Sequence, residues 1–283
     1  MKISKGFKKN WKIILIFVLG LLIFVYPMVS NFYYRVQNNN EVMAFDERAQ
    51  ALDREEIEER MRLARLYNQT LDPSRLADPY SDEEKEGIAN YARMLELREH
   101  IGYVSVPKIR ENIPVYAGTS EEVLQKACGH LEGTSLPIGG VDTHAVITAH
   151  RGLPSVKLFR DLDKMEMGDI FYYTNLETTL AYEVDQILTV EPSNFEPVLV
   201  VEGEDLMTLL TCTPYMINSH RLLVRGHRVE YVPPVVEPIL TMPTGRDLRL
   251  WVYGLGLLVI IVAILTVKRF RRIREIEKKS KFW

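Results

Sequence analysis

The sequence predicts a mainly β domain, a closed barrel or a sandwich, that lies between two apolar segments. The first observation is a series of short segments after residue 100, rich in β-branched and aromatic residues and separated by Gly, Pro, Asn or Asp. Such a series is typical of closed or double-sheet β folds. The second observation is an uncharged apolar run near each end of the 283-residue chain, and the third is a strongly acidic region between these runs.

The first apolar run, residues 13–29, follows a basic segment, residues 1–12, that carries five lysines and no acidic residue. Its 17 residues approach the roughly 20 that a helix needs to cross a bilayer. A cleaved signal peptide is the alternative, but the run is long for one and no small-x-small cleavage site follows it. We therefore expect an uncleaved transmembrane anchor.

The second apolar run, residues 250–267, has 18 uncharged residues and is followed by a basic tail, residues 268–283. Residues 233–249 include several prolines and are expected to form an extended tether to this run. Positive charge beside a membrane span stays in the cytoplasm. The sequence therefore predicts a two-span protein of the cell membrane, with both termini cytoplasmic and the domain between the spans extracellular.

The charge distribution supports this arrangement. The chain has 35 basic and 38 acidic residues. Residues 1–30 contain five basic and no acidic residues, and residues 248–283 contain nine basic and two acidic residues. The remaining 21 basic and 36 acidic residues give residues 31–247 a net charge of −15. Nucleic acid is an unsuitable partner for such a domain, because phosphate binding needs a basic surface.

Residues 30–100 are expected to be helical with one interruption. Residues 41–68 are dense in good helix formers, with Glu and Arg three and four residues apart, and predict one helix that leaves the membrane. Two Asp-Pro steps, at Asp72 and Asp78, then break regular structure. Ser81 and the acidic residues after it resemble a helix N-terminus, which predicts a second helix from about 82 to 97.

Residues 101–232 are expected to form the β domain itself. The segments with strand character are 103–107, 113–118, 144–150, 169–175, 180–190, 205–212 and 220–232. Residues 120–127 and 156–165 are too helical in composition for strands. We expect them to form helices of one or two turns on the surface of the domain.

One cysteine has neighbours that suit nucleophilic chemistry. A cysteine acts as a nucleophile only as a thiolate, so it needs a cation or base nearby. If residues 205–212 and 219–226 are antiparallel neighbours, the loop between them returns Arg221 to the side of Cys212. Its permanent charge could hold the thiolate or an oxyanion. On this segment alone, a buried small Cys212 and a surface Arg221 explain the residues equally well.

A histidine from elsewhere in the chain would complete the site. His150 is the best candidate, because it ends an apolar strand that would fix its backbone and expose its ring. His144 is expected to be structural, and His130 to stabilise a turn. The sequence has no HExxH or CxxC pattern, so we expect no metal. Cys128 and Cys212 could form an extracellular disulfide, but a domain of this size does not need one.

The motifs around these residues resemble those of sortases, the cysteine transpeptidases of Gram-positive cell surfaces. The segment TLLTCTPYMINSHRLLVRG resembles their active-site strand and loop. GHLEGTSLPIGG, ITAHRGLPSVKLFRDLDKM, the two apolar runs and the Asp-Pro-aromatic step resemble class C, the pilin-polymerising branch. The resemblance extends over about residues 35–267 and implies a closed, eight-stranded sortase-type β-barrel with short surface helices.

The resemblance also implies a role for individual residues. Cys212 corresponds to the nucleophile, His150 to the catalytic histidine and Arg221 to the catalytic arginine. The residues that correspond to the lid of class C enzymes are Asp78, Pro79 and Tyr80. Thr211, Tyr215 and His130 are the candidates for residues near the substrate. Met216 departs from the family, where many members have Gly after the Pro-Tyr step, while Cys128 matches no motif position and is expected to be a small packed residue.

The reaction that the resemblance implies is acyl transfer without a cofactor. The enzyme would cleave a Leu-Pro-x-Thr-Gly-like sorting signal between Thr and Gly, and a lysine amine of another pilin subunit would take the acyl group. An anchoring sortase that uses a cell-wall amine, and a hydrolytic cysteine protease, are alternatives. From a different class of function, the chain could be a membrane-tethered scaffold that binds pilins without catalysis.

Overall fold

The computed structural model describes residues 5–71, 76, 78–80, 90–97, 100–233, 254 and 269. The chain divides into two compact units, Met1–Glu237 and Pro238–Trp283. The first unit contains the barrel and the helices whose bounds are given below. The predicted tether, from residue 234 on, and the predicted second span lie outside the described residues except for Gly254, and the predicted tail does so except for Arg269.

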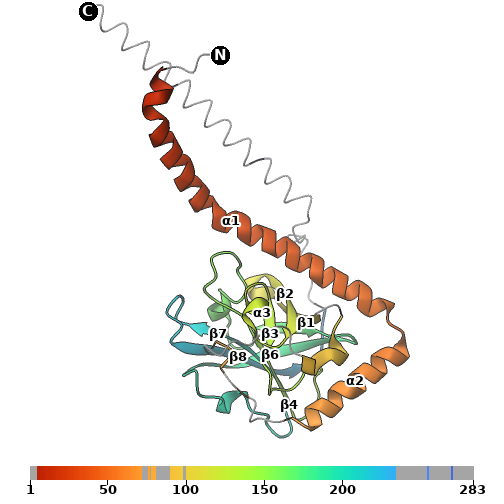
Figure 1. Cartoon of the computed structure of the whole chain (residues 1–283). Helices are drawn as coiled ribbons and strands as arrows, with labels where there is room; N and C mark the ends of the chain where they lie inside the picture. Colours follow the sequence, from red (N-terminus) through yellow and green to blue (C-terminus); the bar gives the residue numbers. More distant parts are fainter. Residues whose placement is uncertain are drawn as a thin grey trace, which may run out of the picture. The chain divides into compact units, whose positions relative to one another are not determined.

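Eight strands form a closed barrel in the order β1-β2-β3-β4-β7-β8-β6-β5, which confirms the predicted mainly β, eight-stranded fold (Figure 1). Strands β2 and β3 are parallel, as are β4 and β7, and the other neighbouring pairs are antiparallel. The bounds of the strands are β1 His100–Val106, β2 Glu111–Ala117, β3 Cys128–His130, β4 Thr143–Thr148, β5 Ile170–Thr174, β6 Thr179–Val190, β7 Asp205–Thr213 and β8 His220–Val229.

Two neighbouring strands that pair in parallel, β4 and β7, are almost completely buried. All six residues of β4 are buried, as are seven of the nine residues of β7. Burial on both faces is expected for strands that pair in parallel, because such strands have other elements over each face. Since parallel strands end at the same edge of a sheet, the residues that follow β4 and β7 are brought to one end of the barrel.

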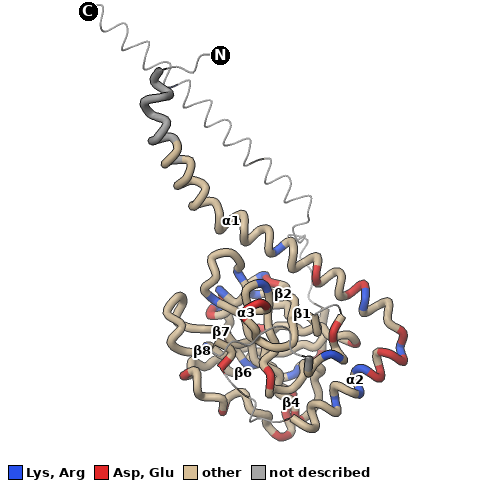
Figure 2. The backbone as a smooth tube through the Cα atoms, viewed as in Figure 1, with Lys and Arg blue, Asp and Glu red and all other residues tan. Residues whose placement is uncertain are grey.

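Two long helices precede the barrel, where the sequence predicted a single helix over residues 41–68. Helix α1 spans Lys5–Ala51 and α2 spans Arg54–Gln69. The single-helix prediction is wrong at Leu52–Asp53, because the Asp53 carboxylate accepts a 2.7 Å hydrogen bond from the backbone N–H of Glu56 and so caps a new helix. Helix α2 carries acidic and basic residues along its length (Figure 2), which form the pairs Arg54–Glu58, Arg60–Glu56 and Arg62–Glu59.

The C-terminal half of α1 packs against β1 and β2 (Figure 1). Phe45 is buried in the main core, and its ring meets that of Tyr103 on β1 at 6.1 Å, edge to face. Arg35 forms a 3.0 Å ion pair with the buried Glu111 of β2. Apolar and charged contacts, which also include His100–Glu41 and a hydrogen bond from the Tyr103 hydroxyl to Asp46, therefore hold this part of α1 on the barrel.

The predicted first span, residues 13–29, is helical and belongs to α1. Its large apolar side chains include many that are exposed, among them Leu19, Ile23 and Phe24 at 56–74 %. Within the part of the chain that the structure describes, no helix combines the length and the apolar character needed to cross a membrane.

The remaining short helices differ in part from expectation. Helix α3, Glu121–Leu124, lies inside the predicted segment 120–127, and Ser120 caps it. The predicted helix over 156–165 is wrong except for one 3₁₀ turn, η4 Leu162–Lys164, because turns occupy the residues before it. The predicted helix over 82–97 is described only from residue 90 on, where η2, Asn90–Leu95, is 3₁₀. The other 3₁₀ turns are η3 Pro107–Ile109 and η5 Glu196–Val198.

Candidate active site

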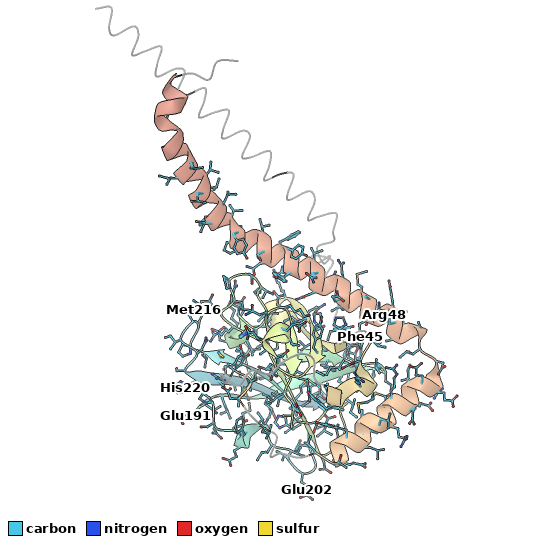
Figure 3. The ribbon with its side chains drawn as sticks, viewed as in Figure 1. Phe45, Arg48, Glu191, Glu202, Met216 and His220 are labelled. Atoms are coloured by element: carbon cyan, nitrogen blue, oxygen red, sulfur yellow. The ribbon has the colours of Figure 1, made fainter. Side chains whose placement is uncertain are left out.

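Cys212 and Arg221 face each other across the β7–β8 hairpin. The two strands are antiparallel, and their register pairs Cys212 with Arg221 directly. Residues 214–219 form the connecting loop, so the predicted hairpin is confirmed. Figure 3 labels Met216 in this loop and His220 at the start of β8, on the side of the barrel away from Phe45 of α1. Cys212 is 4 % exposed and Arg221 is 6 % exposed, so the thiol and the guanidinium share a buried site.

His150 lies two residues after the end of β4, at the same end of the barrel. The last paired residues of β4 and β7 are Thr148 and Leu210, and one further backbone bond joins Ala149 N–H to Leu210 C=O at 3.2 Å. The His150 ring is half-buried, and its Nε2 lies 3.7 Å from Oε2 of Glu121 in the first turn of α3. The parallel pairing of β4 with β7 therefore brings His150 to the end of the strand that carries Cys212.

The segment Asp78–Tyr80, which we call the lid, lies against these residues. Asp78 Oδ1 accepts a 2.7 Å hydrogen bond from Nε of Arg221, and Oδ2 accepts one of 2.6 Å from Nη2. Pro79 is buried. The Tyr80 ring lies 5.2 Å from the His150 ring and 5.1 Å from the centre of the Arg221 guanidinium. The Tyr80 hydroxyl donates a 2.6 Å hydrogen bond to Ala149 C=O.

The closed lid uses the hydrogen-bonding capacity of Arg221. Nε and Nη2 donate to Asp78, while Nη1 donates to the carbonyl oxygens of Asn218 and His220 at 3.0 and 3.1 Å. All three nitrogens are thus engaged, and the two that face the lid are held by a bidentate carboxylate. Such charge-assisted pairs are stronger than neutral hydrogen bonds. An oxyanion that needs Arg221 must therefore displace Asp78.

Burial and neighbouring charges set the protonation of the site. Burial raises the pKa of Cys212 to about 11, and the Asp78 carboxylate adds to this rise, while the Arg221 guanidinium opposes it. Burial also lowers the pKa of His150, against the Glu121 carboxylate, which raises it. With the lid closed, the dominant state at neutral pH is therefore a neutral thiol beside a neutral imidazole.

A pocket lies beside the lid. Two residues of the lid, Asp78 and Pro79, line one part of it. Its apolar lining includes Leu210 of β7, Leu223 of β8, and Phe195 and Val198 of the connection between β6 and β7. Arg221 borders the same pocket. The cavity is small, about 10 Å³, so a peptide segment could pack here only after Asp78 and Pro79 move away.

The other residues that the sequence singled out have clear positions. His144 is buried and bonds Leu199 C=O and the Thr208 hydroxyl, both at 2.8 Å, so it is structural as expected. His130 ends β3 rather than lying in a loop, and its fully buried ring is hydrogen-bonded to the Tyr91 hydroxyl and to Ser135 C=O. Thr211 is also fully buried, whereas 45 % of Tyr215 is exposed in the β7–β8 loop.

Both cysteines are free thiols, so the disulfide alternative is wrong. Cys128 is fully buried on β3, where burial raises its pKa well above the ordinary value. Its side chain is packed in the core, as expected. Among the described residues, no group of three or more His, Cys, Asp and Glu side chains could hold a metal ion.

Sequence reasoning missed two residues that the structure brings to the site. Glu121 opens α3 and reaches His150, but its sequence position indicates only a helix start. Arg151 follows His150 directly, and its guanidinium reaches Thr213 beside Cys212. Neither residue lies near Cys212 in sequence. The lid was found only through the resemblance, because an Asp-Pro-aromatic step by itself indicates no more than a turn.

Comparisons with known proteins agree with this geometry. A family model for the sortase domain matches residues 104–229. Sortase A of Bacillus anthracis is 26% identical over 216 residues, which cover 76% of this chain and 92% of that protein. The structure of sortase C-1 from Streptococcus pneumoniae is 56% identical with a TM-score of 0.67, covering 68% of this chain and 100% of that one. A pilus-related sortase C of Group B Streptococcus is 54% identical with a TM-score of 0.64, covering 69% and 97%.

The barrel and these matches show that the protein is a cysteine transpeptidase built on a closed β-barrel. The chain belongs to the sortase family and, at more than half identity to solved sortase C structures, to its class C branch.

Proposed function

We propose that this sortase polymerises pilins, with Cys212 as nucleophile, His150 as the group that carries protons, and Arg221 as the oxyanion donor. The observation that carries the proposal is the pairing of Cys212 with Arg221 across one hairpin, at the barrel end where His150 follows the parallel strand. A nucleophile, a titratable base and a fixed cation within one buried site are the groups that acyl transfer requires.

In the first step, the sulfur of Cys212 attacks the Thr carbonyl of a Leu-Pro-x-Thr-Gly-like sorting signal. The new S–C bond produces a tetrahedral oxyanion, to which Arg221 donates hydrogen bonds. The C–N bond to Gly then breaks, and His150 gives the proton that came from the thiol to the leaving amine. The products are a thioacyl enzyme and a released C-terminal fragment.

In the second step, a lysine amine of another pilin subunit attacks the thioacyl carbon. An isopeptide bond forms, the S–C bond breaks, and the proton that the amine loses returns through His150 to the Cys212 sulfur. One amide bond replaces another, so no nucleotide or other cofactor is consumed. The acceptor must react before water does, which favours a site that the lid and substrate keep dry.

The reactive state of the pair is a thiolate beside an imidazolium. This state is a minor one while the pKa of Cys212 is about 11 and burial holds the pKa of His150 below its ordinary value. Departure of Asp78 removes a negative charge that raises the pKa of Cys212, and it leaves Arg221 with two unused donors. We therefore propose that substrate binding opens the lid and activates the thiol in the same event.

The pocket beside the lid is our proposed site for the sorting signal. Phe195, Val198 and Leu210 give it an apolar wall that suits the Leu-Pro part of such a signal. The Thr carbonyl would then lie toward Arg221, which borders the pocket. Because Asp78 and Pro79 also line the pocket, a bound signal and a closed lid would compete for the same place.

We also propose that residues 13–29 and 250–267 anchor the enzyme in the cell membrane, with the barrel outside. The exposed apolar side chains of α1 and the basic residues at both ends of the chain support this placement. Helix α1 continues without a break from residues 13–29 to the part that packs on β1 and β2. Anchoring would keep the barrel close to secreted subunits and raise their effective concentration.

The test is incubation of the full chain in detergent with pilins that carry a sorting signal, followed by mass spectrometry. A thioacyl adduct on Cys212 and a Thr–Lys isopeptide between subunits are the expected products. Transfer to a cell-wall amine alone would indicate an anchoring sortase, and a free Thr carboxylate alone would indicate a hydrolase. If the Cys212→Ala chain still assembled pilins, the chain would be a scaffold.

A further inference from the structure

The position of His150 is not fixed by the sheet that precedes it. Strand β4 ends at Thr148, and the last backbone bond to β7 is made by the N–H of Ala149. His150 therefore lies beyond the ladder. Catalysis by a Cys–His pair requires the two side chains to keep a defined separation, because a shift of about 1 Å can lower a rate by about a hundredfold. Other contacts must therefore hold His150.

Two side-chain hydrogen bonds lie on either side of the Cys–His pair. The Thr211 hydroxyl donates to Ala149 C=O at 2.6 Å, and Arg151 Nη1 donates to the Thr213 hydroxyl oxygen at 2.9 Å. The residues just before and just after His150 are thus joined to the residues just before and just after Cys212. This arrangement explains why the cysteine stands between two threonines.

Arg151 is itself held firmly. Its side chain is only 7 % exposed, and Nη2 forms a 2.6 Å ion pair with Asp163. Nε donates to Arg160 C=O at 3.2 Å. All three guanidinium nitrogens are therefore engaged, two with residues 160–163 and one with Thr213, which leaves the side chain little freedom. A lysine could not reproduce these contacts, because its single nitrogen lacks the planar fork of an arginine.

We propose that Arg151 is a positioning residue, which acts through Thr213 to set the distance between His150 and Cys212. This proposal rests on the proposed function of that pair. Arg151 does not touch the reacting atoms in this arrangement. It anchors the backbone on the C-terminal side of His150, where no sheet hydrogen bond does so, and the Thr211 bond anchors the N-terminal side.

The decisive variants are at Thr213, since a valine there keeps the shape of the side chain and removes the oxygen that Arg151 binds. All variants carry Asp78→Ala as well, so that lid opening does not limit the rate. For cleavage of a sorting-signal peptide by the full chain, we expect Thr213→Val to lower kcat about tenfold, with KM changed by less than about twofold. Thr213→Ser keeps the hydroxyl and should restore kcat to within about twofold of the parent.

Two further variants serve as matched controls. Thr179→Val removes a hydroxyl that lies 2.9 Å from that of Thr174 between β5 and β6, and Arg225→Met removes an Arg–carboxylate pair between β6 and β8. Neither should change kcat by more than about twofold, whereas Arg151→Met should lower it about a hundredfold. If Arg151→Met fails to fold, the comparison of Thr213→Val with Thr213→Ser still tests the proposal. Equal kcat for Thr213→Val and the parent, or equal loss in Val and Ser, would overturn the proposal.

A second measurement needs no peptide. Iodoacetamide alkylates the thiolate of Cys212, and a nearby imidazolium stabilises that thiolate at neutral pH. Thr213→Val should therefore lower the ratio of labelling rates at pH 7 and pH 9 severalfold, and Thr213→Ser should not. A parent chain that cleaves no sorting-signal peptide would refute the proposed function. The labelling ratio would still test whether Arg151 and Thr213 position His150. An unchanged ratio in Thr213→Val would contradict that positioning role.

Discussion

Strand β8 carries two arginine–aspartate pairs that look alike but connect different parts of the molecule. Arg221 binds Asp78 of the lid through Nε and Nη2, at 2.7 and 2.6 Å. Arg225 binds Asp185 of β6 through the same two nitrogens, at 3.0 and 3.1 Å. The side chains of the first pair are 8 % and 15 % exposed, and those of the second 23 % and 25 %.

The two pairs differ in what holds the carboxylate. Asp185 belongs to a strand that is hydrogen-bonded to β8 along most of its length, so it cannot leave without breaking the sheet. Asp78 lies outside the barrel, 143 residues before its partner, so β8 would stay intact if Asp78 left. If the lid opens as proposed, the same chemistry gives a permanent connection in one place and a releasable one in the other. Four predictions would break or sharpen this comparison.

The largest expected difference is between the two arginines. Arg221→Met should lower kcat for sorting-signal cleavage on the order of a thousandfold, because the oxyanion loses its charged donor. Arg225→Met should leave kcat within about twofold and lower the melting temperature instead, since it leaves Asp185 without its partner. Peptide cleavage assays and thermal unfolding of both full-length variants measure this. Similar kcat values for the two variants would contradict the assignment of Arg221.

The second prediction concerns acid stability near the permanent pair. Burial lowers the pKa of both His130 and His144 to about 4, and Arg225 and Asp185 lie close enough to His144 to shift its pKa in opposite directions. In the unfolded chain these histidines gain protons near pH 6.5, whereas the folded barrel resists this until about pH 4.

Folding stability should therefore be unaffected by these groups above about pH 6.5 and fall between that pH and about 4. The loss should approach about 2 kcal/mol per histidine at pH 5. Urea unfolding of the full chain at several pH values measures this dependence. His144→Gln should make it shallower, and an equally steep dependence in that variant would exclude His144 as a source.

The third prediction breaks the releasable pair from the lid side. Asp78→Ala should raise the rate of Cys212 alkylation or of peptide turnover about tenfold, because it frees Arg221 and lowers the pKa of Cys212. Asp185→Ala is the matched control and should raise neither rate. If Asp78→Ala changed neither rate, the lid would not gate the site, although the catalytic assignment would stand.

The smallest effect is expected at a third carboxylate, which belongs to neither pair. Glu121 raises the pKa of His150, so Glu121→Gln should lower that pKa and with it the population of the thiolate–imidazolium pair. The acid limb of the pH profile of kcat/KM should move to lower pH, and the plateau should fall about twofold. The effect is small because Glu121 is exposed and therefore screened. Added salt should reduce the difference between variant and parent.

Local patterns in the sequence predicted much of the fold and part of the site. The alternation of strand residues and turn residues indicated the β domain. The position of Arg221, nine residues after Cys212, indicated a hairpin that pairs them, which the register confirms. Composition alone gave a wrong helix boundary at a position where a single capping side chain starts a new helix. Residues 41–68 are good helix formers throughout, yet the Asp53 cap starts a second helix there.

The sequence by itself determined which residues can carry the chemistry, because nucleophile, base and cation are properties of side chains, and because a hairpin brings near neighbours together. Only the tertiary structure decided how these residues are held. The parallel pairing of β4 with β7 places Arg151 against Thr213, 62 residues away, and the lid reaches Arg221 across 143 residues. Contacts between such distant segments depend on how the whole barrel closes, and so they leave no periodic pattern in either segment.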